Sequence, residues 1–125
     1  MEMTLNAVNW FDIPTADFDR ARAFYSALFD YVMPEVPMGP MRMGMPLHEQ
    51  GKGVGGAIIS GDRAPSATGT MVYLNAGRDL DTVLGRVEAA GGSVLTPKTM
   101  IAPGMGYFGV FRDSEGNAVG RHSME

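Results

Sequence analysis

Two histidines and two of the carboxylates on strand-like runs are candidates for acid–base chemistry in this sequence. The chain's two histidines, His48 and His122, stand far apart, so no local metal-binding pair is visible. Asp12 and Glu49 occupy runs with the composition of strands. Imidazoles and carboxylates move protons in general acid–base catalysis, which makes His122 and Asp12 candidate catalytic residues. The same residue types also serve as hydrogen-bonded or solvated groups on strands, and this second interpretation stays open.

A glycine pattern with the spacing G-x-G-x-x-G falls at Gly51, Gly53 and Gly56. In a dinucleotide-binding fold these glycines must follow a strand and open a helix, whose N-terminus faces the pyrophosphate. Here residues 57–59 are Ala-Ile-Ile, and a segment rich in helix breakers comes next. We therefore interpret the glycines as a hairpin that enters a strand.

The sequence has no Cys, which excludes disulfides, thiolate metal sites and a thiol nucleophile.

Methionine is concentrated in one short segment. Five of the eleven methionines fall between residues 33 and 45, in a stretch interrupted by proline and glycine: Met33, Met38, Met41, Met43 and Met45. Flexible, polarizable side chains suit an adaptable apolar pocket wall or a subunit interface. Methionine also fills irregular gaps in protein cores, so core packing is the alternative interpretation.

These residues must be positioned by helices and strands, and only two stretches have apolar residues at helical spacing. The first has Thr15 or Asp17 available as its N-cap, and its apolar face consists of Phe18, Ala21, Phe24, Tyr25, Leu28 and Phe29. The second begins after Asp79 and ends at Gly91-Gly92, and its apolar face consists of Leu80, Val83, Leu84, Val87 and Ala90. Both predicted helices are amphipathic and about 12 residues long.

The two helices belong to an internal repeat. Asp17-Phe18-Asp19 matches Asp79-Leu80-Asp81 at an offset of 62 residues, half of the chain. One strand-like run precedes each helix and three follow it, at 7–13, 31–36, 42–49 and 54–60, and at 70–76, 93–100, 106–112 and 117–123. Each half reads βαβββ, so we predict an α+β fold of two repeats, about 5–61 and 69–124. A unit of about 60 residues is marginal alone, so both repeats should pack into a single domain spanning 1–125.

Composition narrows the classes of function. The chain has 125 residues and a formal net charge of −4, and 45% of its residues are apolar. An acidic chain without a cluster of Lys and Arg lacks the electrostatic attraction that drives binding to nucleic acids and anionic membranes. The first residues lack the basic segment and the long apolar run of a signal peptide. No apolar run in the sequence reaches the ~18 residues of a membrane span. We expect a soluble cytoplasmic protein with no nucleic-acid and no membrane partner.

Several strings, in this order and spacing, resemble the vicinal oxygen chelate superfamily. They are Asp17-Phe18-Asp19-Arg20-Ala21 with Phe24-Tyr25, Val87-Glu88-Ala89-Ala90-Gly91-Gly92, and Phe111-Arg112-Asp113-Ser114-Glu115-Gly116-Asn117. This superfamily includes glyoxalase I, extradiol dioxygenases, and bleomycin and fosfomycin resistance proteins. The resemblance covers essentially the whole chain. It is nearest to the glyoxalase-related bacterial branch, through Gly55-Gly56-Ala57, residues 69–75, Pro97-Lys98-Thr99 and Gly120-Arg121-His122-Ser123.

The resemblance implies curved mixed sheets around a cup-shaped site that both halves form. Metal enzymes of the family place His and Glu ligands on the first and last strand of each half. Carried over by position, these places fall at about Trp10, Ile58, Met71 or Val72, and Gly120. None of these side chains binds a divalent ion, so we expect no metal cofactor. A divalent metal held by shifted ligands is the alternative, because His122 lies two residues past Gly120 and shares its face of the strand.

Strand alternation indicates which residues line the cup. We predict an apolar and aromatic ligand site with a few polar groups, made by Trp10, Tyr73, Asn75, Phe111 and His122. The main hypothesis is a metal-free binding protein that holds a small planar or amphipathic molecule by stacking, with Trp10 as the main platform. The alternative is an enzyme related to glyoxalase I that uses a carboxylate or His122 to move a proton next to a carbonyl. A homologue whose ligand has been lost is a third interpretation.

We also expect a homodimer. The resemblance implies one, since relatives often build the cup within or across a two-fold dimer. The methionine-rich segment and the edges of two open curved sheets would leave apolar surface and unpaired strands that one chain of this length does not cover.

Overall fold

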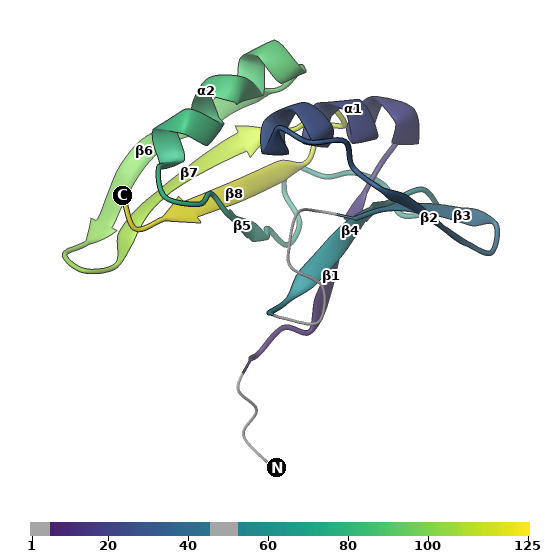
Figure 1. The fold of residues 1–125 in the computed structure, drawn as a ribbon, viewed down its shortest axis with the longest axis horizontal. Coiled ribbons are helices and arrows are strands. Elements are labelled where there is room, and N and C mark those ends of the chain that lie inside the picture. The colour runs from purple at the N-terminus through teal and green to yellow at the C-terminus, as the bar shows by residue number, and fades with distance from the viewer. Residues whose placement is uncertain (1–5, 46–52) are drawn as a thin grey trace.

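The computed structural model of the chain describes residues 6–45 and 53–125. Along these residues two helices and eight strands follow one another (Figure 1). The first half contains β1 (Trp10–Pro14), α1 (Phe18–Phe29), β2 (Glu35–Met38), β3 (Met41–Gly44) and β4 (Gly55–Ile59). The second half contains β5 (Tyr73–Asn75), α2 (Leu80–Ala90), β6 (Ser93–Ala102), β7 (Gly106–Arg112) and β8 (Ala118–Ser123). Each half is a βαβββ unit, as the sequence predicts.

Each half builds its own four-stranded mixed sheet. The strand order is β1-β4-β3-β2 in the first sheet, called sheet A below, and β5-β8-β7-β6 in the second, called sheet B. In both sheets the first and last strands of the half pair in parallel, and the other neighbours pair antiparallel. The predicted α+β fold of two βαβββ repeats is confirmed. Among the described strands, the two sheets share no pairing and are not closed into one barrel.

Both helices are capped where the sequence predicts. Asp17, rather than Thr15, is the N-cap of α1, and its side chain accepts a hydrogen bond from the Arg20 N–H at 3.0 Å. Asp79 caps α2 in a similar way, by accepting a backbone N–H two residues further on. Gly91 ends α2 with a φ of 110°, a conformation that glycine adopts without strain.

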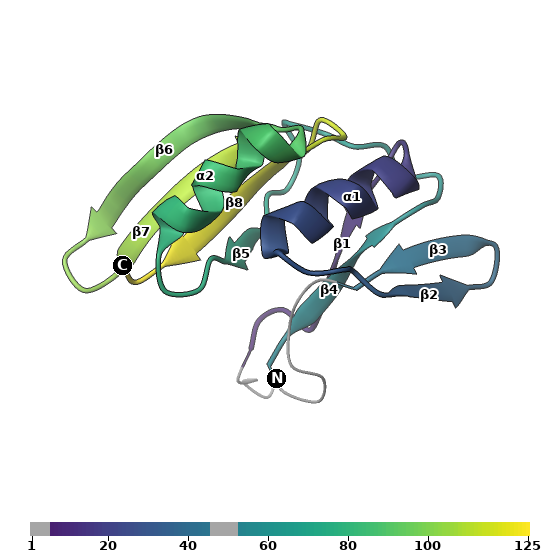
Figure 2. The ribbon, with the colours of Figure 1, turned by 45° about the horizontal axis from the view of Figure 1, so that its top comes forward.

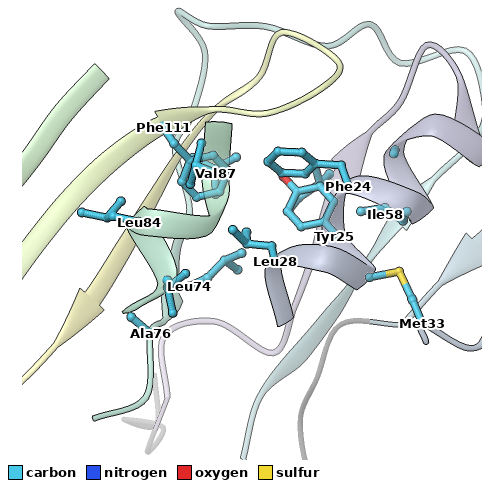
Figure 3. Close-up of a cluster of buried hydrophobic side chains, with 14 of the residues drawn as sticks. Phe24, Tyr25, Leu28, Met33, Ile58, Leu74, Ala76, Leu84, Val87 and Phe111 are labelled. Atoms are coloured by element: carbon cyan, nitrogen blue, oxygen red, sulfur yellow. The ribbon is translucent and has the colours of Figure 1, made fainter. Parts of the chain in front are cut away.

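The two helices lie on one side of the molecule and cover one face of each sheet (Figures 1 and 2). Their apolar faces meet in a shared core, where Phe24 and Tyr25 of α1 pack edge to face with ring centroids 4.9 Å apart. Figure 3 shows these rings between Phe111 of the second half and Ile58 of the first. The two halves therefore bury one common core, as expected for repeats too small to be stable alone.

The turn between β7 and β8 ties the second half to the first. Asp113 is 3% exposed and accepts a hydrogen bond from the Tyr25 hydroxyl at 2.7 Å. Asn117 donates from Nδ2 to the Pro14 carbonyl at the end of β1, at 2.9 Å. Burial and the neighbouring Asp113 carboxylate raise the pKa of Tyr25, so this hydroxyl stays a donor at neutral pH. A turn that contributes to the family resemblance thus has a structural role between the halves.

Several strands differ from their predicted bounds, and β2 and β3 of the first half are two of them. β2 begins at Glu35 rather than at Tyr31, because the Tyr31 N–H still bonds the Ser26 carbonyl at the end of α1, at 3.0 Å. Pro34 has no N–H to offer to a strand partner. β3 ends at Gly44, before the end of the predicted run. Within the described ranges, no helix has the length and apolar content needed to cross a bilayer.

Candidate functional site

Three of the predicted ligand-site residues lie on the face of sheet B that points away from the helices, together with one further aromatic residue. Leu74 on β5 is 6% exposed and belongs to the shared core, so Tyr73 and Asn75 on either side of it face the opposite way. The strand register places Asn75 beside His122 on β8, and His122 beside Phe108 on β7. Tyr73, Asn75, His122 and Phe108 therefore share one face of the sheet.

The ring of Tyr73 lies across Gly120 of the neighbouring strand. A Cβ atom at Gly120 would overlap with the ring, so only glycine leaves room for Tyr73 in this position. The Phe108 ring stands near edge-on to Tyr73, with centroids 6.4 Å apart and an interplanar angle of 66°. Tyr73 is 49% exposed. The two rings form an aromatic surface that faces solvent.

Two adjoining cavities open on this surface. An apolar cavity of about 370 Å³ is lined by Tyr73, Ile101, Phe108 and His122. A more polar cavity of about 530 Å³ shares Tyr73 and His122 and extends to the turn before α2, with the lining residues Leu74, Asn75, Gly77, Arg78, Ser123, Met124 and Glu125. Cavities of this size hold small organic molecules. Tyr73 and His122 stand at the junction of the apolar and polar parts.

His122 and Asn75 present oriented polar groups to these cavities. The Nε2 atom of His122 lies 2.9 Å from the Met105 carbonyl, which only accepts, so a neutral His122 donates from Nε2 and keeps its lone pair on Nδ1. The Asn75 side-chain oxygen accepts the Gly77 N–H at 2.8 Å, which leaves its NH₂ group as a donor. Arg78, an exposed cation, lines the same polar cavity.

Trp10 and Asp12 lie on the other sheet. Ile13 on β1 belongs to the shared core, so Asp12 faces away from the helices, and Trp10 does so by alternation. The indole Nε1 donates to the Asp12 carboxylate at 3.0 Å, which agrees with a common face. Trp10 is 44% exposed and therefore does not fill the core. Neither residue lines the two cavities on sheet B.

The prediction that Phe111 lines the ligand site is wrong. Phe111 is fully buried and packs against Phe24 of α1, with ring centroids 5.9 Å apart. Gly109, two residues earlier on β7, lies against Leu84 of α2, so this phase of the strand faces the helices. Phe108 takes the place expected for Phe111. Sequence reasoning missed it because β7 carries apolar residues on both faces, so alternation alone does not tell the faces apart.

Two of the places where the resemblance would put metal ligands offer no ligand side chain on the open face of their sheets. Ile58 is buried in the core and faces the helices, so it lies on the wrong side of sheet A for a cup ligand. At Gly120 the Tyr73 ring occupies the space that a ligand side chain would need. Among residues 6–45 and 53–125, no three His, Cys, Asp or Glu side chains are grouped to hold an ion. His48 and Glu49 lie outside the described residues.

Residues 7–120 match the family described as the Glyoxalase/Bleomycin resistance protein/Dioxygenase superfamily. The chain belongs to this superfamily. The vicinal oxygen chelate fold inferred from the sequence is thereby confirmed. No curated protein matches the chain.

Solved structures of glyoxalase/bleomycin resistance proteins have the same fold. One from Albidiferax ferrireducens T118 is 17% identical, with a TM-score of 0.66 over 94% of this chain and 99% of that chain. A glyoxylase/bleomycin resistance protein/dioxygenase domain from Frankia sp. EAN1pec is 16% identical, with a TM-score of 0.67 over 96% and 98%. The fosfomycin resistance protein FosX from Listeria monocytogenes is 18% identical, with a TM-score of 0.64 over 97% and 92%. At these identities the likeness establishes the fold alone.

Proposed function

We propose that this member of the superfamily binds a small amphipathic organic molecule on the open face of sheet B, without the family's divalent metal. The observation that carries the proposal is the pair of adjoining cavities that share Tyr73 and His122. The apolar cavity suits a ring or a short hydrocarbon body. The polar cavity suits a hydrogen-bonding or anionic group, for which Asn75 and Arg78 offer donors.

Stacking supplies the affinity in this proposal. A planar ligand that displaces water from the half-exposed Tyr73 ring and from Phe108 gains about 0.5–1.5 kcal/mol for each aromatic pair, beyond the burial of apolar area. Asn75 and Arg78 then fix the orientation of the ligand and contribute less to the affinity.

A specific observation also favours an enzymatic alternative. His122 is held through Nε2 by the Met105 carbonyl, and its Nδ1 lone pair is left for a proton. In this alternative Nδ1 accepts a proton from the carbon next to the carbonyl of a small substrate and returns it to the neighbouring carbon or oxygen. This chemistry is that of a glyoxalase I-related lyase, carried out by a side chain in place of a metal-bound base.

We further propose that a homodimer completes the cup. Trp10 and Val8 are 44% and 51% exposed at the start of sheet A, and β1 and β5 stand at the edges of their sheets. A second copy that covers these edges would bury apolar surface and bring a further aromatic ring to the ligand. Light scattering after size-exclusion chromatography should give the mass of two chains. A monomer mass at micromolar concentration would contradict the dimer.

Calorimetric titration with 2-naphthoate, a planar ring that carries one carboxylate, tests the binding site. Tyr73→Ala should weaken binding by about tenfold, whereas Tyr73→Phe, which keeps the ring, should stay within about threefold. Val32→Ala, at a position 81% exposed and on the other half, serves as a surface control. Equal affinity for the wild type and Tyr73→Ala would place the ligand elsewhere.

Trp10 provides a second readout because it is the only tryptophan. If the proposed dimer brings Trp10 of one copy to the cavities on sheet B of the other, the ligand should quench the indole in a saturable way, and Trp10→Ala should weaken binding more than it lowers the melting temperature. Elemental analysis should find no stoichiometric zinc, nickel or iron. One tightly held ion of these per chain would favour the enzymatic alternative instead.

A further inference from the structure

The hairpin of β2 and β3 carries three of the clustered methionines on one face. Its register places Met38 opposite Met41, and Met43 opposite Val36. Directly opposed residues of an antiparallel pair share a face, and so do residues two apart on one strand. Met38, Met41 and Met43 therefore lie together on one side of a two-stranded ribbon. Figure 2 shows this ribbon extending from the rest of sheet A.

The other face of the ribbon is fixed by contacts with α1. The Arg42 guanidinium donates to the Asp19 carboxylate at 2.8 Å and lies 4.4 Å from the centroid of the Phe18 ring. Arg42 stands between Met41 and Met43 on β3. Its contacts with α1 therefore orient both methionines away from the helix.

Met33 behaves differently from these three and helps to define the faces. It is fully buried, and its sulfur would lie 2.7 Å from a Cβ atom at Gly44, the residue that follows Met43. Gly44 thus faces the core and Met43 faces the opposite way. Core packing explains Met33 but not Met38, Met41 and Met43.

The spacing of the three side chains allows their sulfurs to meet at one point. The Cβ atoms of opposed residues lie about 4.5–5.5 Å apart, and those of residues two apart on a strand lie about 7 Å apart. Two rotatable bonds position the sulfur of each methionine, so the sulfur adapts over several ångströms. The Met41 side chain lies beside Gly61 in this structure and has to turn to bring its sulfur to the other two. Met38 is 48% exposed, and Met41 and Met43 are half-buried, so solvent reaches the group.

Thioether sulfurs are soft, neutral ligands that favour Cu(I) over hard divalent ions. No group of three His, Cys, Asp or Glu side chains in the described residues competes for such an ion. We propose that Met38, Met41 and Met43 form a three-thioether site for Cu(I), for which Ag(I) is a redox-stable analogue. This site is separate from the ligand site on sheet B and does not depend on the proposed function.

Leucine distinguishes coordination from apolar packing, because it has a similar volume and no sulfur. The test is titration of the full chain with silver nitrate in chloride-free buffer, followed through the methyl signals of ¹³C-labelled methionine. One equivalent of Ag(I) should shift three of the eleven methionine signals. The variant with Met38→Leu, Met41→Leu and Met43→Leu should lose at least about tenfold in affinity. The matched control carries Met100→Leu and Met105→Leu, at positions 51% and 58% exposed on the other half.

The pH dependence of the Ag(I) affinity is a second, independent test of thioether coordination. Thioethers do not bind protons near neutral pH, so the affinity should be the same at pH 7 and pH 5. A histidine ligand would lose affinity below its ordinary pKa of about 6.5. Competition with bicinchoninate under anaerobic conditions repeats the comparison with Cu(I) itself. The proposal is overturned by unchanged Ag(I) affinity in the triple variant, by affinity that falls with pH, or by the absence of binding at micromolar Ag(I).

Discussion

The carboxylate of Glu115 accepts two hydrogen bonds from the guanidinium of Arg20, at 2.7 and 3.1 Å, although the residues are 95 positions apart. The same carboxylate accepts the backbone N–H groups of the N-cap residue Asp17 and of Ala16 just before it, at the start of α1. Glu115 lies in the turn between β7 and β8. A side chain of the second half therefore caps the first helix of the first half.

Replacing this carboxylate should weaken the junction between the halves. Glu115→Gln removes the charge that pairs with Arg20 and that faces the positive end of α1, and we expect the free energy of unfolding to fall by about 1–3 kcal/mol. Urea denaturation measures the change. Glu88→Gln, at an exposed position on α2, is the matched control and should change stability by less than about 0.5 kcal/mol. Equal effects of the two substitutions would show that the junction contributes nothing.

The same carboxylate should make stability depend on pH. Burial alone would raise the pKa of Glu115, but hydrogen bonds from Arg20, Asp17 and Ser114 hold that pKa below its ordinary value of 4.5. The folded chain thus binds this proton less readily than the unfolded chain, so the stabilisation is present above pH 4.5 and is lost as the pH falls further. The stability difference between the wild type and Glu115→Gln should shrink from pH 6 to pH 3. A difference that stays constant over this range would contradict the assignment.

Arg121 should be replaceable by an apolar residue without loss of stability. Arg121 is 2% exposed, its Nη2 donates to the Asn75 carbonyl at 2.8 Å, and its Nε and Nη1 have no hydrogen-bond partner. The guanidinium also lies 5.0 Å from the centroid of the Phe29 ring. Burial lowers the pKa of Arg121 to about 10, because the charged form is desolvated. We expect Arg121→Met to raise the free energy of unfolding by about 1 kcal/mol and the melting temperature by roughly 4 °C.

Thermal denaturation of the exposed control Arg63→Met should show little change. If Arg121→Met instead lowers the melting temperature by several degrees, the contacts of the guanidinium with Asn75 and Phe29 outweigh the cost of burying its charge.

Gly120 should be required for the ligand site more than for folding. The Cβ atom of Gly120→Ala would overlap with the Tyr73 ring, so the ring must leave its position over β8. Binding of 2-naphthoate should fall by about tenfold or more. Gly85→Ala is the control, since a Cβ atom there meets nothing within 4 Å and alanine favours a helix by about 0.5–1 kcal/mol. Calorimetry and thermal denaturation of both variants separate the two effects. Full binding by Gly120→Ala would remove Tyr73 from the site.

Local signals in the sequence define most of the fold. The N-cap at Asp79, the C-cap at Gly91 and the 3.6-residue periodicity act within a few residues, so the helices are predicted almost to their ends. The repeat then predicts the strand number of each half. β2 is misplaced because the bond from Tyr31 to the end of α1 is not visible in the pattern of apolar residues.

The candidate site is less predictable, because it depends on which face of each strand is turned to the helices. Alternation places Tyr73 and Asn75 on one face of β5, and it places His122 on the same face of β8 as Gly120, which the register sets beside Tyr73. It fails on β7, where Phe108 and Phe111 are both aromatic and only packing against α2 decides between them. The methionines of residues 33–45 are hard to place for the same reason. Met33 lies in the core, whereas Met38, Met41 and Met43 lie on the face turned away from the helices.

The central claim is that a small amphipathic molecule binds over Tyr73 on the open face of sheet B. A crystal structure of the chain with 2-naphthoate tests it most directly. The account predicts the naphthalene ring against Tyr73 and Phe108, in the cavity that Ile101 borders, with the carboxylate directed toward Asn75 and Arg78. A ligand bound on another face, or an empty sheet B in crystals of a complex that forms in solution, would contradict it.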